Sequence, residues 1–422
     1  MTINGQQASS GKRVLLTGGR APATLDLARQ LAANGHWIFM AESCPEHLCR
    51  QSRAIQRCYL VPEPAANPKA YVGALRQIIN EERIEWLLPM CEELFYVAGG
   101  LSELSSLCRV FVEPLDRLRR LHSKWEFMQR VQKIGFSIPK TQLLTSQQDC
   151  HTFMEYEAEQ ASLRQATGEA AAVKWVFKPV FSRFSSKVII AEVTPDGWQP
   201  RLRINTLPIS ADMPWVVQQY IEGTAYCSYS IVHQGQMTAH AVYPVGFTAG
   251  IGACISFEAI SHPWIDRWVE RFVQEEGFTG QIAFDFIEVG DGTVYPLECN
   301  PRATSGIHLF RVEDRLDEAL FMQEVYPQKR VTPRPEQRAM ITVAMASYGL
   351  AGLLSSGGWR RFPDWIRFLV SARDVVFRPS DPQPFWQQFR LVYWNGRRGA
   401  KQRIPIMEAS TQDIEWNGGE MV

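Results

Sequence analysis

The sequence lacks the features that mark disulfide-stabilised, zinc-binding and membrane-spanning proteins. Its cysteines number nine, none of them belongs to a CxxC pair, and its eight histidines include no HExxH motif. Neither a disulfide framework nor a transition-metal site is therefore expected. No apolar run approaches the ~20 residues that span a bilayer, and the polar N-terminus lacks the apolar core of a signal peptide. We expect a cytoplasmic protein with no membrane partner.

An excess of charge of one sign is also missing. The 44 Lys and Arg residues balance the 44 Asp and Glu residues, and no dense basic run occurs. Because a nucleic-acid-binding protein needs a concentrated positive field, and this sequence shows none, we expect no nucleic-acid partner. What is present is the composition of a globular protein, 45% hydrophobic and 21% charged. A chain of 422 residues exceeds one ordinary domain, so two or three domains are expected.

The first part of the chain predicts an α/β domain. Between residues 13 and 118, short apolar runs alternate with segments of helical periodicity. The first run, Arg13 to Leu16, is followed by a helical face that ends in C-cap style at Asn34 and Gly35. Such βαβ alternation predicts a parallel sheet with helices on both faces. We assign residues 1–118 to this domain.

The remainder predicts an α+β domain and a C-terminal extension. A helix is expected to begin at Ser123, which has capping-box spacing to Glu126. We then expect antiparallel strand pairs, at 173–177 with 187–192, 215–219 with 228–233, and 281–289 with 293–298. We assign residues 119–330 to this domain. In the extension, 331–422, helical pieces are expected around 336–356 and 362–372.

The most informative segment is a predicted hairpin, residues 280–302, with an Asp-Gly turn at 291 and 292. Asp285 lies in one strand, and Glu298 and Asn300 end the other. Glu298 and Asn300 are two residues apart, so their side chains share a face of an extended strand. Three oxygen-bearing groups are thus predicted to converge, which suits Mg²⁺. Arg302, on the same parity, has the charge to stabilise a transferring phosphoryl group or a carboxylate.

Two lysines upstream also stand at unusual places. Lys178 ends an apolar strand, where a charge is costly unless it meets an anion. Lys124 lies near a helix start, where the helix dipole disfavours a cation. Each of them alone is more often a surface lysine. The strand 216–223 offers backbone groups to an adenine edge, with the amide of Gln218 beside them.

Taken in this order, the residues resemble the ATP-grasp superfamily, which includes D-alanine–D-alanine ligase, biotin carboxylase and carbamoyl-phosphate synthetase. The resemblance covers residues 13 to about 312. The segment 87–98, LLPMCEELFYVA, further resembles a subgroup described as carbamoyl-phosphate-synthetase-like. Members of the superfamily typically make an acyl phosphate from a carboxylate and ATP, which an amine or thiol then attacks. The resemblance implies ATP and Mg²⁺ as cofactors, with Mn²⁺ as an alternative ion.

Roles follow by position from this resemblance. Lys124 and Lys178 correspond to the two phosphate-contacting lysines, and Lys178 and Arg302 to catalytic groups. The implied magnesium ligands are Asp285, Glu298 and Asn300. The implied adenine hinge consists of Gln218, Gln219, Tyr220 and Ile221.

Three departures from the superfamily pattern bear on how nucleotide is held. The loop 179–187 contains no glycine, and its serines and Arg183 are candidates to replace backbone amides at the phosphates. Ala225 stands where an acidic residue usually binds the ribose. Gln218 stands where a glutamate is common.

Three functions remain open on the sequence. The first is an ADP-forming ligase that joins a small carboxylate to an amine. The second is a carboxylate kinase or carbamoyl-phosphate-type synthase, and the third is a non-catalytic nucleotide-binding module. Glu258 and His308 are candidates to orient or deprotonate the amine, although each is as readily a structural residue. The extension either covers the substrate side or forms a homodimer interface.

Overall fold

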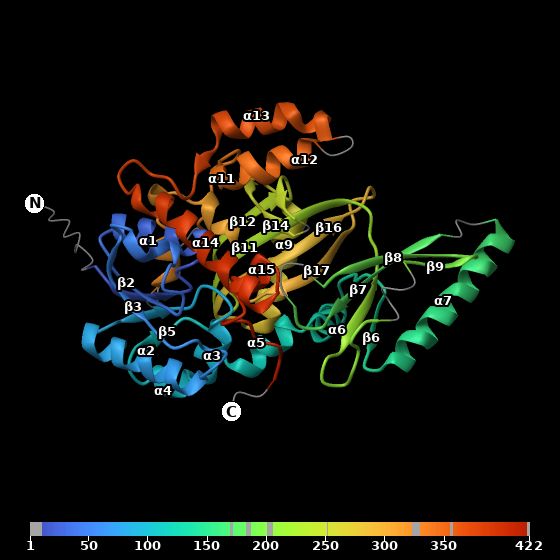
Figure 1. Cartoon of the computed structure of the whole chain (residues 1–422), viewed down its shortest axis with the longest axis horizontal. Helices are drawn as coiled ribbons and strands as arrows, with labels where there is room; N and C mark the ends of the chain where they lie inside the picture. Colours follow the sequence, from blue (N-terminus) through green and yellow to red (C-terminus); the bar gives the residue numbers. More distant parts are fainter. Residues whose placement is uncertain are drawn as a thin grey trace, which may run out of the picture.

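The computed structural model describes residues 11–168, 172–182, 187–200, 206–250, 252–322, 330–354 and 358–419. Its first part is a five-stranded parallel sheet in the order β3-β2-β1-β4-β5, coloured blue in Figure 1. The strands are β1 (Arg13–Thr17), β2 (Trp37–Glu42), β3 (Ile55–Leu60), β4 (Trp86–Leu88) and β5 (Arg109–Val110). The helices are α1 (Pro22–Ala33), η1 (Leu48–Gln51), α2 (Pro68–Glu82), α3 (Leu94–Gly99), α4 (Leu101–Leu104) and α5 (Leu115–His122). The predicted βαβ arrangement is confirmed.

Two antiparallel sheets follow. The first, in the order β6-β10-β7-β8-β9, projects with α7 at one end of the long axis (Figure 1). The second has the order β12-β11-β16-β17. The elements of the first sheet are α6 (Lys124–Ile134), β6 (Thr141–Leu144), α7 (Gln147–Thr167), β7 (Val173–Pro179), β8 (Ile189–Thr194), β9 (Gly197–Gln199) and β10 (Trp215–Gln219). Those of the second are β11 (Thr224–His233), β12 (Gln236–Pro244), α9 (Pro263–Glu276), β16 (Gly280–Glu288) and β17 (Val294–Asn300), with a small pair β13 (Thr248–Ala249) and β14 (Ala253–Cys254).

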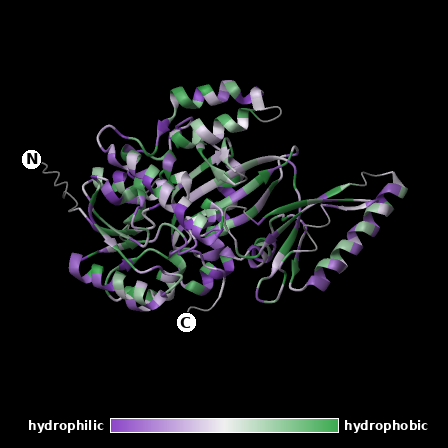
Figure 2. Ribbon diagram, in the orientation of Figure 1, coloured by the Kyte–Doolittle hydropathy of each residue, from purple (hydrophilic) through white to green (hydrophobic). Residues whose placement is uncertain are grey.

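The C-terminal part adds a three-stranded sheet and several helices. Its sheet joins β15 (Ser256–Glu258), β18 (Arg338–Met340) and β19 (Arg373–Asp374). The helical elements are η2 (Ser305–Leu309), η3 (Val312–Asp314), α10 (Leu316–Leu320), α11 (Thr342–Ala344), the π-helical η4 (Met345–Gly349), α12 (Leu350–Leu354), η5 (Gly358–Arg361), α13 (Phe362–Ser371), α14 (Gln383–Gln402) and α15 (Ile406–Ala409). Hydrophilic and hydrophobic residues alternate along the outer helices (Figure 2). None of the described helices combines the length and apolar character needed to cross a membrane.

Local signals explain where the helix before the first antiparallel sheet begins and ends. The hydroxyl of Ser123 accepts a hydrogen bond from the backbone N–H of Glu126 at 3.2 Å, which caps α6 as predicted. The helix ends at Gly135, whose φ of 93° is readily adopted only by glycine. One face of α6 then packs Phe127 against Phe272 of α9 and Phe284 of β16. This aromatic cluster packs α6 against the second sheet and α9.

Two strand predictions are confirmed and one is wrong. Strand β7 pairs with β8, and β16 pairs with β17 around the Asp-Gly turn, as expected. The predicted pairing of 215–219 with 228–233 does not occur, because β10 lies between β6 and β7 while β11 lies between β12 and β16. The chain passes from one sheet to the other at Gly223, where a Cβ atom would lie 2.2 Å from the carbonyl oxygen of Glu288. The glycine turn therefore separates the two sheets.

The start of the predicted helix at 336–356 is also wrong. Residues 338–340 form β18, which pairs with β15 so that Ala339 lies opposite the buried Phe257. Pairing with a strand far away in the sequence outweighs the local helical pattern there. The domain boundaries at 118 and 330 remain predictions.

Helix α1 is tied to the C-terminal part by buried ion pairs. Asp26, fully buried, accepts from Arg373 at 2.9 Å, from Arg378 at 2.5 Å and lies 2.9 Å from Nδ1 of His308. One turn along the helix, Arg29 donates to Asp381 at 2.9 Å. Burial acts to raise the pKa of Asp26, but Arg373 and His308 outweigh it and hold that pKa well below its ordinary value.

We predict that Asp26→Asn lowers the free energy of unfolding by about 3–5 kcal/mol, since it leaves two arginines near a buried site without their carboxylate. Urea unfolding measures this. The exposed pair of Asp116 and Arg120 provides the control, and Asp116→Asn is expected to change stability by less than about 1 kcal/mol. Because the folded-state pKa of Asp26 is depressed, its contribution persists above about pH 4 and is lost as the pH falls further. Equal effects of the two substitutions would contradict the assignment.

Candidate active site

The site is built on the β16–β17 hairpin. The register places Asp285 directly opposite Glu298, and the register shifts immediately beyond this pair. Asn300 lies two residues further along β17, and its Nδ2 lies 3.4 Å from Oδ2 of Asp285. The structure therefore brings the three predicted ligands together. Their oxygen donors form a set that fits Mg²⁺, which proteins hold through one or two carboxylates while phosphate and water fill the other positions.

The bulge in this hairpin supplies one further acceptor. Because Asp285 pairs with Glu298 and Phe286 with Pro296, Leu297 is the extra residue of β17. An extra residue at a bulge leaves its backbone groups unpaired in the ladder. The carbonyl of Leu297 accepts a hydrogen bond from Nζ of Lys178 at 3.3 Å. The irregularity within the ladder thus also holds a lysine.

Two lysines face the paired carboxylates. Nζ of Lys124 lies 3.6 Å from Oε2 of Glu298, and a third of the Glu298 side chain remains exposed. Burial acts to raise the pKa of Glu298, but Lys124 and Lys178 outweigh it and lower that pKa to about 2. Burial raises the pKa of Asp285 to about 7, and the charge of Glu298 opposite adds to the rise. The pair therefore holds one firmly ionised carboxylate and one that titrates near neutrality.

Lys178, at the end of β7, is buried and held by the predicted hinge strand. Its Nζ donates to Oε1 of Gln218 at 2.9 Å, and Nε2 of Gln218 donates to the hydroxyl of Thr141 at 2.9 Å. Burial lowers the pKa of Lys178 to about 8, and the charge of Lys124 acts in the same direction. The Gln218 amide is thus engaged at both ends by the protein. It positions Lys178, whereas the sequence suggested that it faces adenine.

The remaining hinge residues are Gln219, which ends β10, and the two residues that follow it. The N–H of Gln219 donates to the carbonyl of Lys140 at 2.8 Å, and that of Tyr220 donates to the carbonyl of Lys174 at 2.9 Å. The Tyr220 ring is 38% exposed, with the Lys174 ammonium 5.8 Å from its centroid. Among the described residues, no hydrogen bond is found for the N–H of Ile221. That donor is available to a ligand.

Lys124 lies at the start of α6 and contacts the segment that follows Lys178. Its Nζ donates to the carbonyl and to the hydroxyl of Ser182, both at 3.2 Å, and its backbone N–H donates to the carbonyl of Val180 at 3.2 Å. The predicted phosphate contact Arg183 lies outside the described residues, as do residues 184–186 of the glycine-free loop. Two described residues of this loop, Val180 and Ser182, therefore accept hydrogen bonds from Lys124.

Arg302 reaches the site from the end of the hairpin. Its NH2 donates to Oδ1 of Asn300 at 3.1 Å, and its Nε lies 4.0 Å from Oε1 of the fully buried Glu92. Sequence reasoning did not single out Glu92 as a site residue. The available signal was its place after β4, since ligands of open α/β sheets bind at the carboxyl ends of the strands. His122 was also missed, and its charge helps to lower the pKa of Glu298.

The two candidates for the amine side have structural partners. Glu258 accepts from Arg338 at 2.9 Å and from Arg367 at 3.0 Å. His308 is buried against Asp26, and burial lowers its pKa. Among the described residues, no group of three or more His, Cys, Asp or Glu side chains that could hold a metal ion is found, since the hairpin set combines two carboxylates with the amide of Asn300. The chemistry is therefore concentrated at the hairpin and the two lysines.

Comparison with known proteins places this geometry on a known fold. No family model matches the chain, and no curated protein matches its sequence. Among solved structures, an L-amino acid ligase from Bacillus licheniformis aligns with a TM-score of 0.56 at 15% identity, over 78% of this chain and 79% of that one. N5-carboxyaminoimidazole synthetase from Staphylococcus aureus aligns with a TM-score of 0.57 at 12% identity, over 84% and 86%.

A third similar structure was solved with nucleotide. It is the biotin carboxylase domain dimer of 2-oxoglutarate carboxylase from Hydrogenobacter thermophilus, in complex with MgADP, ADP and bicarbonate. It aligns with a TM-score of 0.55 at 13% identity, over 77% of this chain and 73% of that one. At such identities the likeness concerns the fold. The chain therefore shares the fold of these three structures, and the mixed α/β architecture is the one that its sequence predicted.

Proposed function

We propose that this chain is an ATP- and Mg²⁺-dependent ligase that activates a small carboxylate as an acyl phosphate and joins it to an amine, releasing ADP and phosphate. The observation that carries the proposal is the pair of opposed carboxylates, Asp285 and Glu298, facing the buried lysines Lys124 and Lys178. Carboxylates can bind a metal ion and lysines can bind phosphate oxygens, so this set suits a metal-bound polyphosphate. The shared fold with an L-amino acid ligase supports the same class.

Asp285, Glu298 and Asn300 would hold the metal, which supplies charge neutralisation at the phosphate oxygens. Lys124 and Lys178 would bind phosphate oxygens, because both are buried lysines that face the paired carboxylates of the proposed metal site. Burial lowers the pKa of Lys178 to about 8, and an arriving phosphate would raise that pKa again by favouring the charged form. Arg302, oriented by Asn300 and Glu92, is placed to bind the substrate carboxylate or the transferring group.

The reaction then balances in two steps. A carboxylate oxygen attacks the γ-phosphorus and ADP leaves, which converts a poor leaving group into phosphate. The amine nitrogen attacks the acyl carbon, phosphate leaves, and the amine loses a proton. Since the acyl phosphate hydrolyses in water, the segment that follows Lys178 is suited to exclude water from it. We propose an amino acid or a similar small molecule as the amine.

The direct test is product analysis. The protein is incubated with ATP, Mg²⁺ and pools of carboxylates and amines, and nucleotide and phosphate are quantified. ADP and phosphate released only with both co-substrates present support ligation. AMP and pyrophosphate would exclude the acyl-phosphate route, and ADP formed with carboxylate alone would indicate a carboxylate kinase. Nucleotide binding without turnover in any pool would indicate a regulatory module.

We predict that Glu298→Gln reduces turnover by about 100-fold or more, because the ionised ligand nearest both lysines is lost. The matched control is Asp291→Asn, an equal change of charge at the far end of the same hairpin, where Asp291 is exposed. Steady-state rates of ADP release measure both variants. Undiminished turnover in Glu298→Gln would remove the assignment of this residue.

We also predict that metal affinity depends on pH through Asp285. Its pKa of about 7 in the metal-free protein means that protons compete with the metal below neutrality. The affinity for Mn²⁺, followed by the electron-spin-resonance signal of the free ion, should fall about fivefold from pH 7 to pH 6. In Asp285→Asn the affinity should be low and nearly independent of pH in this range. A variant that keeps the wild-type slope would assign the titration to another group, such as Lys178.

A further inference from the structure

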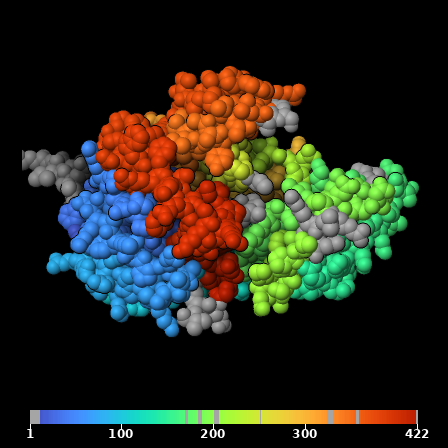
Figure 3. Space-filling model, viewed as in Figure 1, coloured from blue at the N-terminus to red at the C-terminus, as the bar shows by residue number. Residues whose placement is uncertain are grey.

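The last described residues of the chain lie between the N-terminal sheet and the first antiparallel sheet. This C-terminal segment, residues 405–419, follows α14 and contains α15. In Figure 3 it appears in red between the blue N-terminal part and the light-green residues. Its side chains contact both parts, as the following distances show.

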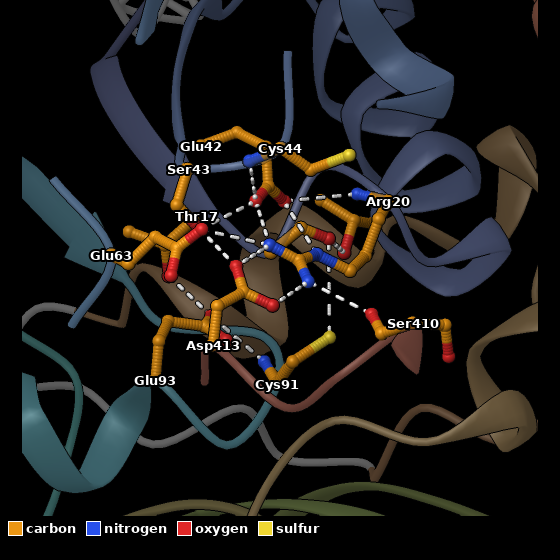
Figure 4. Close-up of polar contacts among 12 residues, drawn as sticks. Thr17, Arg20, Glu42, Ser43, Cys44, Glu63, Cys91, Glu93, Ser410 and Asp413 are labelled. Atoms are coloured by element: carbon orange, nitrogen blue, oxygen red, sulfur yellow. Dashed lines mark hydrogen bonds and ion pairs between the residues drawn. The ribbon is translucent and has the colours of Figure 1, made fainter. Parts of the chain in front are cut away.

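The segment is anchored in the crevice of the N-terminal sheet. Asp413 is 2% exposed, and its two carboxylate oxygens accept from NH1 and NH2 of Arg20, both at 2.7 Å (Figure 4). The hydroxyl of Ser43 donates to Asp413 at 2.6 Å, and the carbonyl of Ser410 accepts from Arg20 at 2.8 Å. Burial acts to raise the pKa of Asp413, but Arg20 outweighs it and lowers that pKa. A bidentate buried pair fixes orientation as well as distance.

The anchor lies at the topological switch point of the sheet. Arg20 follows β1, from which the chain runs to β2 on one side, while β4 lies on the other side of β1. Beside it, Glu93 after β4 accepts from the hydroxyl of Thr17 at 2.6 Å and from the N–H of Cys91 at 2.9 Å (Figure 4). Ligands of open α/β sheets bind at this crevice. The protein's own C-terminal segment lies across it.

Three residues beyond Asp413, an aromatic side chain bridges to the nucleotide side. Trp416 stacks on Phe95 of α3, with ring centroids 4.7 Å apart, and meets Phe181 edge-on at 5.7 Å. Gly418, with φ of 82°, approaches the Phe181 ring so closely that a Cβ atom would lie 2.4 Å from it. The C-terminal segment thus packs on the Phe181 ring from two positions, Trp416 and Gly418.

Phe181 is flanked by the two residues that hold Lys124. The carbonyl of Val180 accepts from the backbone N–H of Lys124, and Ser182 accepts from its ammonium twice. Trp416 contacts the Phe181 ring, and the next residue, Ser182, accepts the hydrogen bonds of Lys124. Trp416 is therefore connected to a predicted phosphate-binding lysine through one ring and one peptide unit. A small displacement of the ring moves the acceptors of Lys124.

We propose that Trp416 and Asp413 are positioning residues of the nucleotide site: Asp413 fixes the C-terminal segment on Arg20, and Trp416 holds Phe181 so that Ser182 orients Lys124 towards the phosphates of ATP. The proposal rests on the proposed function for the ligand of Lys124. It assigns the segment 405–419 to the active site, although it is more than 100 residues from the magnesium hairpin in sequence.

The test compares tryptophan variants of the full chain. Trp416→Ala should raise the dissociation constant of MgATP about tenfold, measured by calorimetry, because misplacement of a binding group weakens its contact. Trp416→Phe keeps an aromatic ring against Phe95 and Phe181 and should bind nearly as the wild type does. The matched control is Trp386→Ala on α14, since Trp386 is 64% exposed, and it should leave MgATP binding unchanged.

A second measurement needs no nucleotide. Hydrogen exchange in the apo protein should be faster at 180–182 in Trp416→Ala than in the wild type or in Trp386→Ala, because the Phe181 ring loses its cover. Asp413→Asn should accelerate exchange in the same segment. Unchanged exchange at 180–182 in Trp416→Ala, or equal weakening of MgATP binding by Trp386→Ala, would overturn the proposal. A wild-type protein that binds MgATP but ligates nothing would refute only the proposed ligase activity.

Discussion

Two carboxylates directly opposite each other at the end of a hairpin set the central constraint on this structure. Like charges across an antiparallel pair repel, and burial strengthens the repulsion. In the structure the repulsion is met by Lys124 and Lys178, and by the rise in the pKa of Asp285 to about 7. These lysines come from α6 and β7, outside the hairpin. The hairpin can therefore hold its charge only when these two separate segments are assembled against it.

The same principle extends to the contact between the first and last parts of the chain. Arg20, Asp26 and Arg29, at or just before α1, are all buried, and each pairs with a residue beyond position 370. Buried ion pairs add little net stability over apolar packing, but a member left alone is strongly unfavourable. Each pair thus penalises arrangements in which the C-terminal part is displaced. The extension belongs to the folded unit that surrounds the crevice.

The sequence predicted what depends on local pattern. The βαβ alternation, the cap at Ser123 and the Asp-Gly hairpin are encoded by spacings of a few residues, and the structure has all three. Convergence of Asp285, Glu298 and Asn300 followed from the predicted hairpin turn and from strand parity. Their roles as ligands remain predictions, because the geometry fits a metal without demonstrating one.

What escaped prediction depends on partners far away in sequence. Strand β10 was assigned a neighbour in the adjacent sheet, because nothing local distinguishes a hairpin from a passage between two sheets. Glu258 and His308 were weighed as bases, and their arginine and aspartate partners lie 80 to 282 residues away. The bond between Arg20 and Asp413 spans 393 residues, and no spacing rule reveals which carboxylate a buried arginine meets. Charge pairing becomes predictable only once the fold is known.

The glutamine at position 218 has a physical reason in the hydrogen-bond chain around Lys178. The hydroxyl of Thr141 donates to the carbonyl of Pro139 at 2.8 Å, so its oxygen can only accept from Gln218. The other end of the Gln218 amide accepts from Lys178 at 2.9 Å.

A glutamate in this place would set a second acceptor against the Thr141 oxygen and would neutralise Lys178 by a direct ion pair. The amide satisfies both neighbours and leaves the positive charge of the lysine uncompensated on that side. Because the Gln218 amide is neutral, it does not offset the positive charge of Lys178, and that charge can attract an anion. The departure from the superfamily pattern at Gln218 therefore strengthens the case that Lys178 binds phosphate.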